Sequence, residues 1–167
     1  MNMYRTLHRF PSPARSALCA VLAALGLGNP AVAEEGSRAL RVPPLPRYQQ
    51  ECAACHVAYP PGLLHSASWQ RVLADLPRHY GVDASLDPAV VKELATWLSA
   101  NAATGKGVGF EPPQDRITRS PWFIRKHREV AAAVWQRPAV RSAANCTACH
   151  AQAERGDFNE HQVRIPQ

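Results

Sequence analysis

Two copies of one short motif carry the chemistry of this 167-residue sequence. Residues 52–56 read C-A-A-C-H and residues 146–150 read C-T-A-C-H. The pattern C-x-x-C-H is typical of c-type haem attachment, in which two thiols add to the vinyl groups of one porphyrin and the adjacent histidine, His56 or His150, reaches the iron. We therefore predict two covalent haem c groups, bound through Cys52, Cys55, Cys146 and Cys149.

Cysteines in such pairs also have three other uses in proteins. Paired C-x-x-C motifs of a zinc site usually lie about 15–20 residues apart, whereas 90 residues separate Cys55 from Cys146. A thioredoxin-like redox pair needs a βαβ context, and no such pattern is visible. Two disulfides, the ordinary use of four cysteines in an exported chain, stay open as an alternative.

The first 33 residues have the pattern of an export signal. A basic start precedes an apolar run of 11 residues, 17–27, and the small residues Ala31 and Ala33 flank Val32 before Glu34. The run is shorter than the roughly 20 residues that span a bilayer, so a retained signal anchor is the weaker alternative. We expect cleavage after about Ala33, a periplasmic protein and no transmembrane segment in the mature chain.

Composition narrows the class of protein further. A content of 46% hydrophobic and 19% charged residues is typical of a folded chain and excludes disorder or a membrane bundle. Without the signal, 16 basic and 13 acidic side chains remain, a net charge of +3. This modest charge and the predicted export argue against a nucleic-acid partner.

The axial ligands of the irons must come from a short list of residues. Both methionines, Met1 and Met3, lie in the predicted signal, so histidine–methionine coordination is excluded in the mature chain. A second histidine, a weaker group or an open position remains for each iron, and the choice decides between electron transfer and substrate binding. The histidines of the predicted mature chain outside the two motifs are His65, His79, His127 and His161.

Helical periodicity favours His79 and His127 over the others. Trp69, Val72, Leu73 and Leu76 have the spacing of one apolar helix face, which Ser66 or Ser68 would cap, and His79 lies at its end. Ser120-Pro121 is typical of a helix start, and His127 would lie among Phe123, Val130 and Val134 on the apolar face of that helix. His65 remains an alternative to His79, and we expect His161 to be solvated.

The remaining segments predict a mostly α fold with little or no β structure. We expect a short helix over 48–51, a turn at 59–62 whose carbonyls would accept a hydrogen bond from His56 Nδ1, a helix from Asp87-Pro88 to about Asn101, and a further helix at Pro138. Residues 34–104 would hold the first haem and 114–167 the second, joined by the Gly- and Pro-rich linker 105–113. Lobes this small are marginal without a cofactor, so we expect the apoprotein to be largely unfolded.

The sequence resembles the exported dihaem cytochrome c family over most of the mature chain. The similar segments are 51–64, Ser68-Trp69, 79–81 and 84–87 in the first half, and 120–123, His127, 146–150, 156–158 and Ile165-Pro166 in the second. The resemblance implies a small class I cytochrome c-like N-terminal lobe, a C-terminal helical haem-binding lobe of less common form, and bis-histidine irons held by His56 with His79 and by His150 with His127. It also implies redox partners, among them a small high-spin, oxygen-binding c-type cytochrome and a membrane cytochrome b.

The resulting hypothesis is a periplasmic electron carrier rather than an enzyme. The alternative is a dihaem oxidoreductase or peroxidase-like enzyme, or a gas sensor, in which one haem keeps an open coordination position. A basic cluster is expected near the second haem, where it would neutralise propionates, steer an acidic partner, or simply form a solvated face; its members are Arg116, Arg119, Arg125, Lys126 and Arg128.

Overall fold

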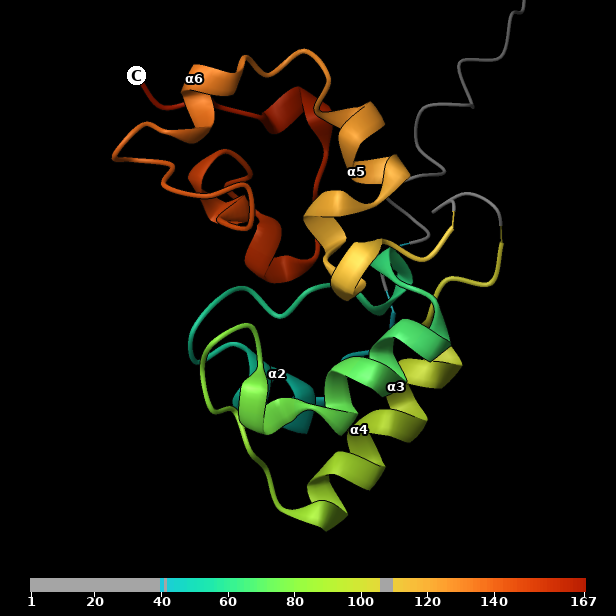
Figure 1. The fold of residues 1–167 in the computed structure, drawn as a ribbon. Helices are drawn as coiled ribbons and strands as arrows, with labels where there is room; N and C mark the ends of the chain where they lie inside the picture. Colours follow the sequence, from blue (N-terminus) through green and yellow to red (C-terminus); the bar gives the residue numbers. More distant parts are fainter. Residues whose placement is uncertain (1–39, 41, 106–109) are drawn as a thin grey trace, which may run out of the picture. The chain divides into compact units, whose positions relative to one another are not determined.

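The structure is a computed structural model, and it describes residues 40, 42–105 and 110–167 (Figure 1). Its α-helices are α2 (Pro46–Cys52), α3 (Ser66–Ala74), α4 (Pro88–Asn101), α5 (Pro121–Lys126) and α6 (Ala132–Trp135). Single 3-10 turns are η1 (Pro61–Leu63), η2 (Leu76–Arg78), η4 (Pro113–Asp115), η5 (Ile117–Arg119), η6 (Cys146–Ala148), η7 (Ala153–Arg155) and η8 (Glu160–Gln162). Within the described residues there is no strand, only isolated bridges, so the predicted mostly α fold is confirmed.

Some of the predicted segments lie outside the residues that the structure describes. The predicted export signal, residues 1–33, and residues 106–109 of the predicted linker are not among the described residues. No helix in the described ranges combines the length and the apolar character needed to cross a membrane. Below, the N-terminal half means residues 42–105 and the C-terminal half residues 110–167.

Helix α4 forms where the sequence predicts it. The Asp87 carboxylate accepts the Ala89 backbone N–H at 2.8 Å, and Pro88 occupies the first turn, where its missing N–H costs nothing. Leu94 and Leu98 are fully buried on the face that packs against α3. The helix ends at Asn101, as expected.

Helix α3 has the predicted buried face but different ends. Trp69 and Leu73 are buried, whereas Ser66 is the first helical residue and Ser68 is buried inside the helix, so neither caps it. The helix stops at Ala74 and continues as η2, because Pro77 has no N–H to donate and its ring clashes with a continuing α-helix. His79 therefore lies just after a 3-10 turn rather than at the end of a long helix.

The single helix predicted over 121–134 is wrong, since it forms two short pieces. Its start is as predicted, with the Ser120 hydroxyl accepting the Phe123 N–H at 3.1 Å, but α5 ends at Lys126 and His127 is its C-cap. Of the proposed apolar face only Phe123 and Val134 are buried, so a continuous helix would gain little packing. The helix expected at Pro138 is also absent, and residues 138–140 form a turn.

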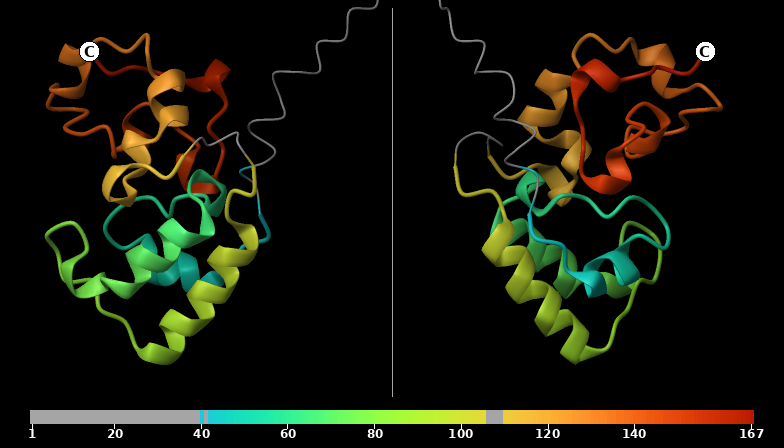
Figure 2. Two further views of the ribbon diagram at one scale, coloured as in Figure 1. Left: turned by 45° about the vertical axis from the view of Figure 1, so that its right-hand side comes forward. Right: turned by 180° about the vertical axis from the view of Figure 1, so that it is seen from behind.

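The buried apolar side chains are distributed unevenly between the halves. Figure 2 shows the ribbons of both halves from two further sides. One core joins α2, α3 and α4 in the N-terminal half, and it contains Tyr48, Ala58, Leu64, Trp69, Leu73, Leu76, Leu94, Leu98 and Ala102. The buried hydrophobic residues described in the C-terminal half are Phe123, Val134, Val140 and Ala153. The C-terminal half therefore has much less apolar packing of its own.

Candidate haem sites

The first motif begins in α2 and continues into the turn after it. Cys52 is the last residue of α2, and Cys55 and His56 follow in an exposed turn. Burial raises the pKa of the Cys52 thiol to about 11, and burial likewise raises that of Cys146 to about 11. None of the four cysteines is in a disulfide, so the thiols of both motifs are free to form other bonds.

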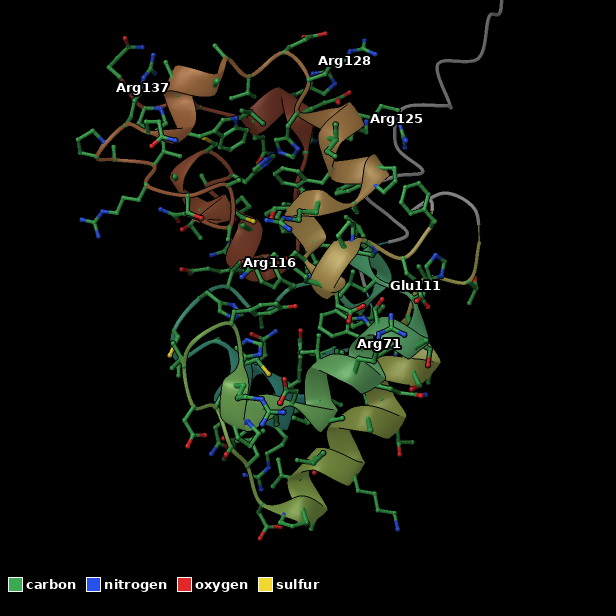
Figure 3. The ribbon with its side chains drawn as sticks, viewed as in Figure 1. Arg71, Glu111, Arg116, Arg125, Arg128 and Arg137 are labelled. Carbon is green, nitrogen blue, oxygen red and sulfur yellow. The ribbon has the colours of Figure 1, made fainter. Side chains whose placement is uncertain are left out.

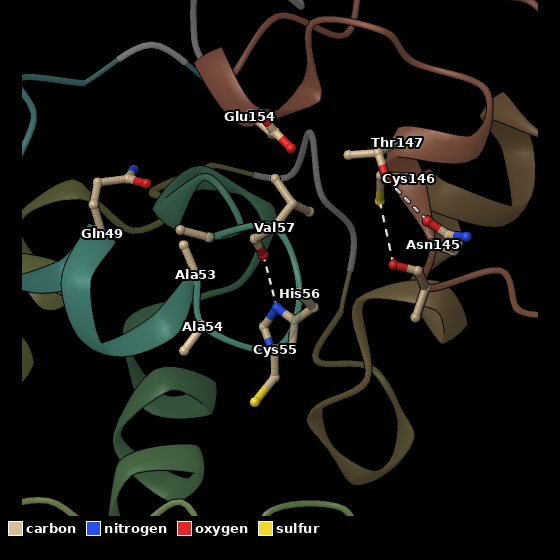
Figure 4. Close-up of a pocket in the computed structure, with 12 residues that line it drawn as sticks. Gln49, Ala53, Ala54, Cys55, His56, Val57, Asn145, Cys146, Thr147 and Glu154 are labelled. Atoms are coloured by element: carbon tan, nitrogen blue, oxygen red, sulfur yellow. Dashed lines mark hydrogen bonds between the residues drawn. The ribbon is translucent and has the colours of Figure 1, made fainter.

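The His56 ring is held from two sides. It stacks on the Tyr59 ring with 4.8 Å between centroids, and its Nδ1 lies 2.7 Å from the Val57 carbonyl oxygen (Figure 4). Because a carbonyl can only accept, Nδ1 carries the proton and Nε2 keeps a lone pair for a metal. The acceptor predicted at 59–62 is wrong: the carbonyls of Tyr59, Pro60 and Pro61 already accept from Tyr48, Leu63 and Trp69.

His79 faces His56 at a separation that suits one iron between them. Their ring centroids lie 6.2 Å apart and the ring planes differ by 23°. A bond of about 2.0 Å from an imidazole nitrogen to a metal places two rings on opposite sides of one ion with centres about 6 Å apart. The structure thus pairs the first motif with His79, the histidine favoured by the sequence.

The second motif is paired with His127 in the same way. The centroids of His127 and His150 lie 6.1 Å apart, with ring planes at 75°. His127 Nδ1 lies 2.9 Å from the Phe123 carbonyl, and its ring stacks on Phe123 at 4.0 Å. His150 Nδ1 is buried with no hydrogen-bond partner among the described residues. A buried ring nitrogen left unpaired costs roughly 1–3 kcal/mol, which fits a site completed by a group that the chain does not itself supply.

The electrostatics favour a neutral ring at His79 and at His150. Burial is the main cause that lowers the pKa of His79, and His56 and Arg116 lower it further. Burial and His127 lower the pKa of His150. A metal binds only the neutral imidazole, so the lowered pKa values keep these histidines in their ligating form at neutral pH.

The two other histidines among the described residues lie elsewhere. His65 precedes α3, where its Nδ1 lies 3.1 Å from the Ala103 carbonyl and its backbone pairs with Ala103. His161 lies in the exposed turn η8. Within the described ranges no three His, Cys, Asp or Glu side chains gather as metal ligands would.

Residues of both motifs line one cavity of about 890 Å³ (Figure 4). Cys55, His56, Cys146 and Thr147 contribute to its wall. Beside it, the Tyr59 hydroxyl donates a 2.8 Å hydrogen bond to the Ala144 carbonyl, two residues before the second motif. The two attachment segments, far apart in sequence, are therefore neighbours in space, and Tyr59 contacts both.

The predicted basic cluster is dispersed in the structure (Figure 3). Arg116 lies against Tyr80, with its guanidinium carbon 4.3 Å from the ring centroid, which places it next to the first histidine pair rather than the second. Lys126 is paired with Glu160 at 3.5 Å and Arg128 with Glu129 at 3.7 Å. Tyr59 and Tyr80 are each bound across the two halves. Their sequence signals are adjacency to the motif and to His79 and their place in the family-like segments 51–64 and 79–81, and neither signal assigns them a role.

Comparison with known proteins gives a consistent result. The family model described as "Dihaem cytochrome c" matches residues 48–158. The chain is similar to the solved structure of DHC purified from Rhodobacter sphaeroides, with 44% identity, a TM-score of 0.62, and coverage of 71% of this chain and all of that one. It is also similar to a diheme cytochrome type c from Shewanella baltica OS155, with 39% identity, a TM-score of 0.65, and coverage of 75% and 95%. No curated protein is matched.

Proposed function

Because the chain belongs to the dihaem cytochrome c family and so carries two covalently attached haem c groups, we propose that it is a periplasmic electron-transfer protein with bis-histidine irons. The observation that carries the proposal is the pairing of each motif histidine with a second histidine at about the same centroid separation, 6.2 Å in one pair and 6.1 Å in the other. Two filled axial positions favour electron transfer over substrate binding.

Each residue has a role in this proposal. Cys52 and Cys55 hold the first haem and Cys146 and Cys149 the second. His56 and His79 ligate the first iron, and His150 and His127 the second. The haem supplies an iron that changes between the ferrous and ferric states. The Val57 and Phe123 carbonyls orient His56 and His127 through their Nδ1 protons, which keeps Nε2 directed for ligation.

The predicted mature chain has no methionine, and this affects the reduction potentials that we expect for the two haems. Methionine–histidine ligation raises the reduction potential, so two histidines on each iron favour comparatively low potentials. We propose other redox proteins as partners, including a small high-spin c-type cytochrome and a membrane cytochrome b. Mass spectrometry of the exported protein tests the localisation, and an N-terminus at about Glu34 is expected.

Absorption spectroscopy tests the function. The oxidised and reduced holoprotein should show two low-spin haems for each chain, counted as pyridine haemochromes, and no high-spin band. His79→Ala and His127→Ala should each convert one haem to a high-spin form that binds carbon monoxide. A high-spin fraction in the unmodified protein would instead support the alternative of an oxidoreductase or gas sensor with an open position.

A further inference from the structure

The segment that enters the C-terminal half, Glu111–Arg116, is tied to the N-terminal half by ionic hydrogen bonds (Figure 3). The Arg71 guanidinium on α3 donates to both Asp115 carboxylate oxygens, at 3.0 and 2.7 Å, and to Glu111 at 2.7 Å. A two-pronged guanidinium–carboxylate contact fixes orientation as well as distance. We call residues 111–116 the linking segment.

The same segment holds Tyr80, the residue that follows His79. The Tyr80 hydroxyl lies 3.1 Å from the carbonyl oxygens of both Gln114 and Asp115, and it donates its hydrogen between them. The Arg116 guanidinium covers the Tyr80 ring. Tyr80, Gln114 and Asp115 all have positive φ, at 51°, 58° and 53°. Non-glycine residues keep this conformation only where surrounding contacts enforce it.

His79 differs from His56 and His127, though not from His150, in how its ring is held. The rings of His56 and His127 each donate from Nδ1 to a backbone carbonyl, the usual means of fixing a ligating histidine. Among the described contacts the His79 ring makes no such hydrogen bond. The His79 ring instead makes a T-shaped contact with the Tyr80 ring, with 4.9 Å between centroids.

We propose that Tyr80 is a positioning residue for the first haem: anchored by the linking segment, it holds the His79 ring in place of the missing carbonyl hydrogen bond. The proposal rests on His79 being an axial ligand. It makes the first iron depend on a segment that the second iron does not use, since the ring of His127, the C-cap of α5, is fixed by the Phe123 carbonyl of that helix. Loosening the anchor should let His79 leave the iron more often.

Carbon monoxide binding to the reduced holoprotein measures that departure, because the gas takes the position His79 vacates. Tyr80→Phe removes the hydroxyl and keeps the ring. We expect carbon monoxide to bind one haem of each chain about fivefold faster, the factor expected from losing one hydrogen bond. The difference spectrum should match that of His79→Ala, which identifies the first haem, and the rate at the second haem should stay unchanged.

Tyr48→Phe is the matched control. Its hydroxyl also donates to a backbone carbonyl, Tyr59 O at 2.7 Å, but in the buried core of the same half. We expect lower thermal stability without faster carbon monoxide binding. An unchanged rate in Tyr80→Phe, or equal acceleration in Tyr48→Phe, would overturn the positioning role. An unaltered spectrum in His79→Ala would overturn the ligand assignment first, and with it this inference.

Discussion

Arg116 is a cationic side chain of the C-terminal half that lies beside the first histidine pair. Its guanidinium lies 4.3 Å from the Tyr80 ring centroid, and its charge lowers the pKa of His79 as a smaller effect than burial. A positive charge near an iron favours the reduced state, because reduction adds negative charge. Arg116 should therefore raise the reduction potential of the first haem.

Arg116→Gln should lower the potential of the first haem by on the order of tens of millivolts, the effect of one partly solvated charge. The second haem should keep its potential. A spectroelectrochemical titration that resolves the two haems makes the measurement, with Arg125→Gln on α5 as the control for removing a charge elsewhere. Equal shifts in both variants would mean that only the net charge matters.

The ring planes of the two histidine pairs predict two distinguishable irons. The planes of His56 and His79 differ by 23°, and those of His127 and His150 by 75°. Near-parallel rings split the energies of the iron orbitals that they overlap, whereas near-perpendicular rings leave those orbitals close in energy. Electron paramagnetic resonance of the oxidised protein should show two low-spin signals in equal amounts, the one from the second haem with the wider spread of g values. Two identical signals would contradict these geometries.

The residues at the sites were partly predictable. His79 and His127 could be ranked above His65 and His161, because apolar spacing and helix-start signals are local. The Val57 acceptor was not predictable, since it depends on which carbonyls in 59–61 are already used by Tyr48, Leu63 and Trp69. Such competition for acceptors is decided by tertiary structure.

At the scale of elements, the helices differ in how far local sequence signals, such as caps and apolar spacing, determine where they begin and end. α4, with 14 residues, has an Asp87 cap, Pro88 and a buried leucine face, and its ends are where the sequence predicts them. α5 and α6 have 6 and 4 residues. Helices shorter than about 12–15 residues are marginal alone and form only where packing supports them. The apolar spacing from Phe123 to Val134 therefore predicts one continuous helix, whereas two short helices form.

The same contrast predicts unequal dependence on haem. The N-terminal half has a continuous core around Leu94 and Leu98, whereas the C-terminal half has short helices and little buried apolar surface. Removing the second haem with Cys146→Ala and Cys149→Ala should unfold the C-terminal half, with loss of amide protection there and retention in α3 and α4. Hydrogen exchange detects this. The matched double variant at Cys52 and Cys55 should leave more structure in its own half, and the reverse ranking would contradict the argument.

At the scale of the whole described chain, contacts distant in sequence join the two halves. Tyr59 donates to Ala144 across 85 residues, and Arg71 donates to Asp115 across 44. Neither is visible in a local pattern, because each pairs common surface residue types whose proximity only the fold decides. Both lie beside residues of the first histidine pair, so the contacts between the halves and the surroundings of His56 and His79 are set together.

The Arg71–Asp115 contact should make this arrangement sensitive to acid. The Arg71 hydrogen bond is the main cause that holds the pKa of Asp115 below its usual value, against a smaller opposing effect of burial. A carboxyl whose folded pKa lies below its unfolded value, about 3.9, contributes its full stability above that pH. The contribution is lost as the pH falls through the lower folded value.

Asp115→Asn should therefore be less stable than the unmodified protein at pH 7, by less than about 1 kcal/mol because Arg71 is half exposed. The difference should begin to shrink below about pH 4, where the carboxyl of the unfolded chain becomes protonated, and it should be lost as the pH falls through the lower folded pKa of Asp115. Urea unfolding of both holoproteins across this range measures it, and acid effects on the histidines cancel because they are common to both. Asp75→Asn, which breaks a local ion pair with Arg78 at 2.6 Å, controls for losing an exposed ion pair within one half.

The two variants should also differ in carbon monoxide binding. Asp75→Asn should leave the rate at the first haem unchanged. Asp115→Asn should raise that rate at pH 7, because the linking segment would no longer be fixed to α3. A stability difference that stayed constant down to pH 3 would show that the Asp115 charge does not hold the segment.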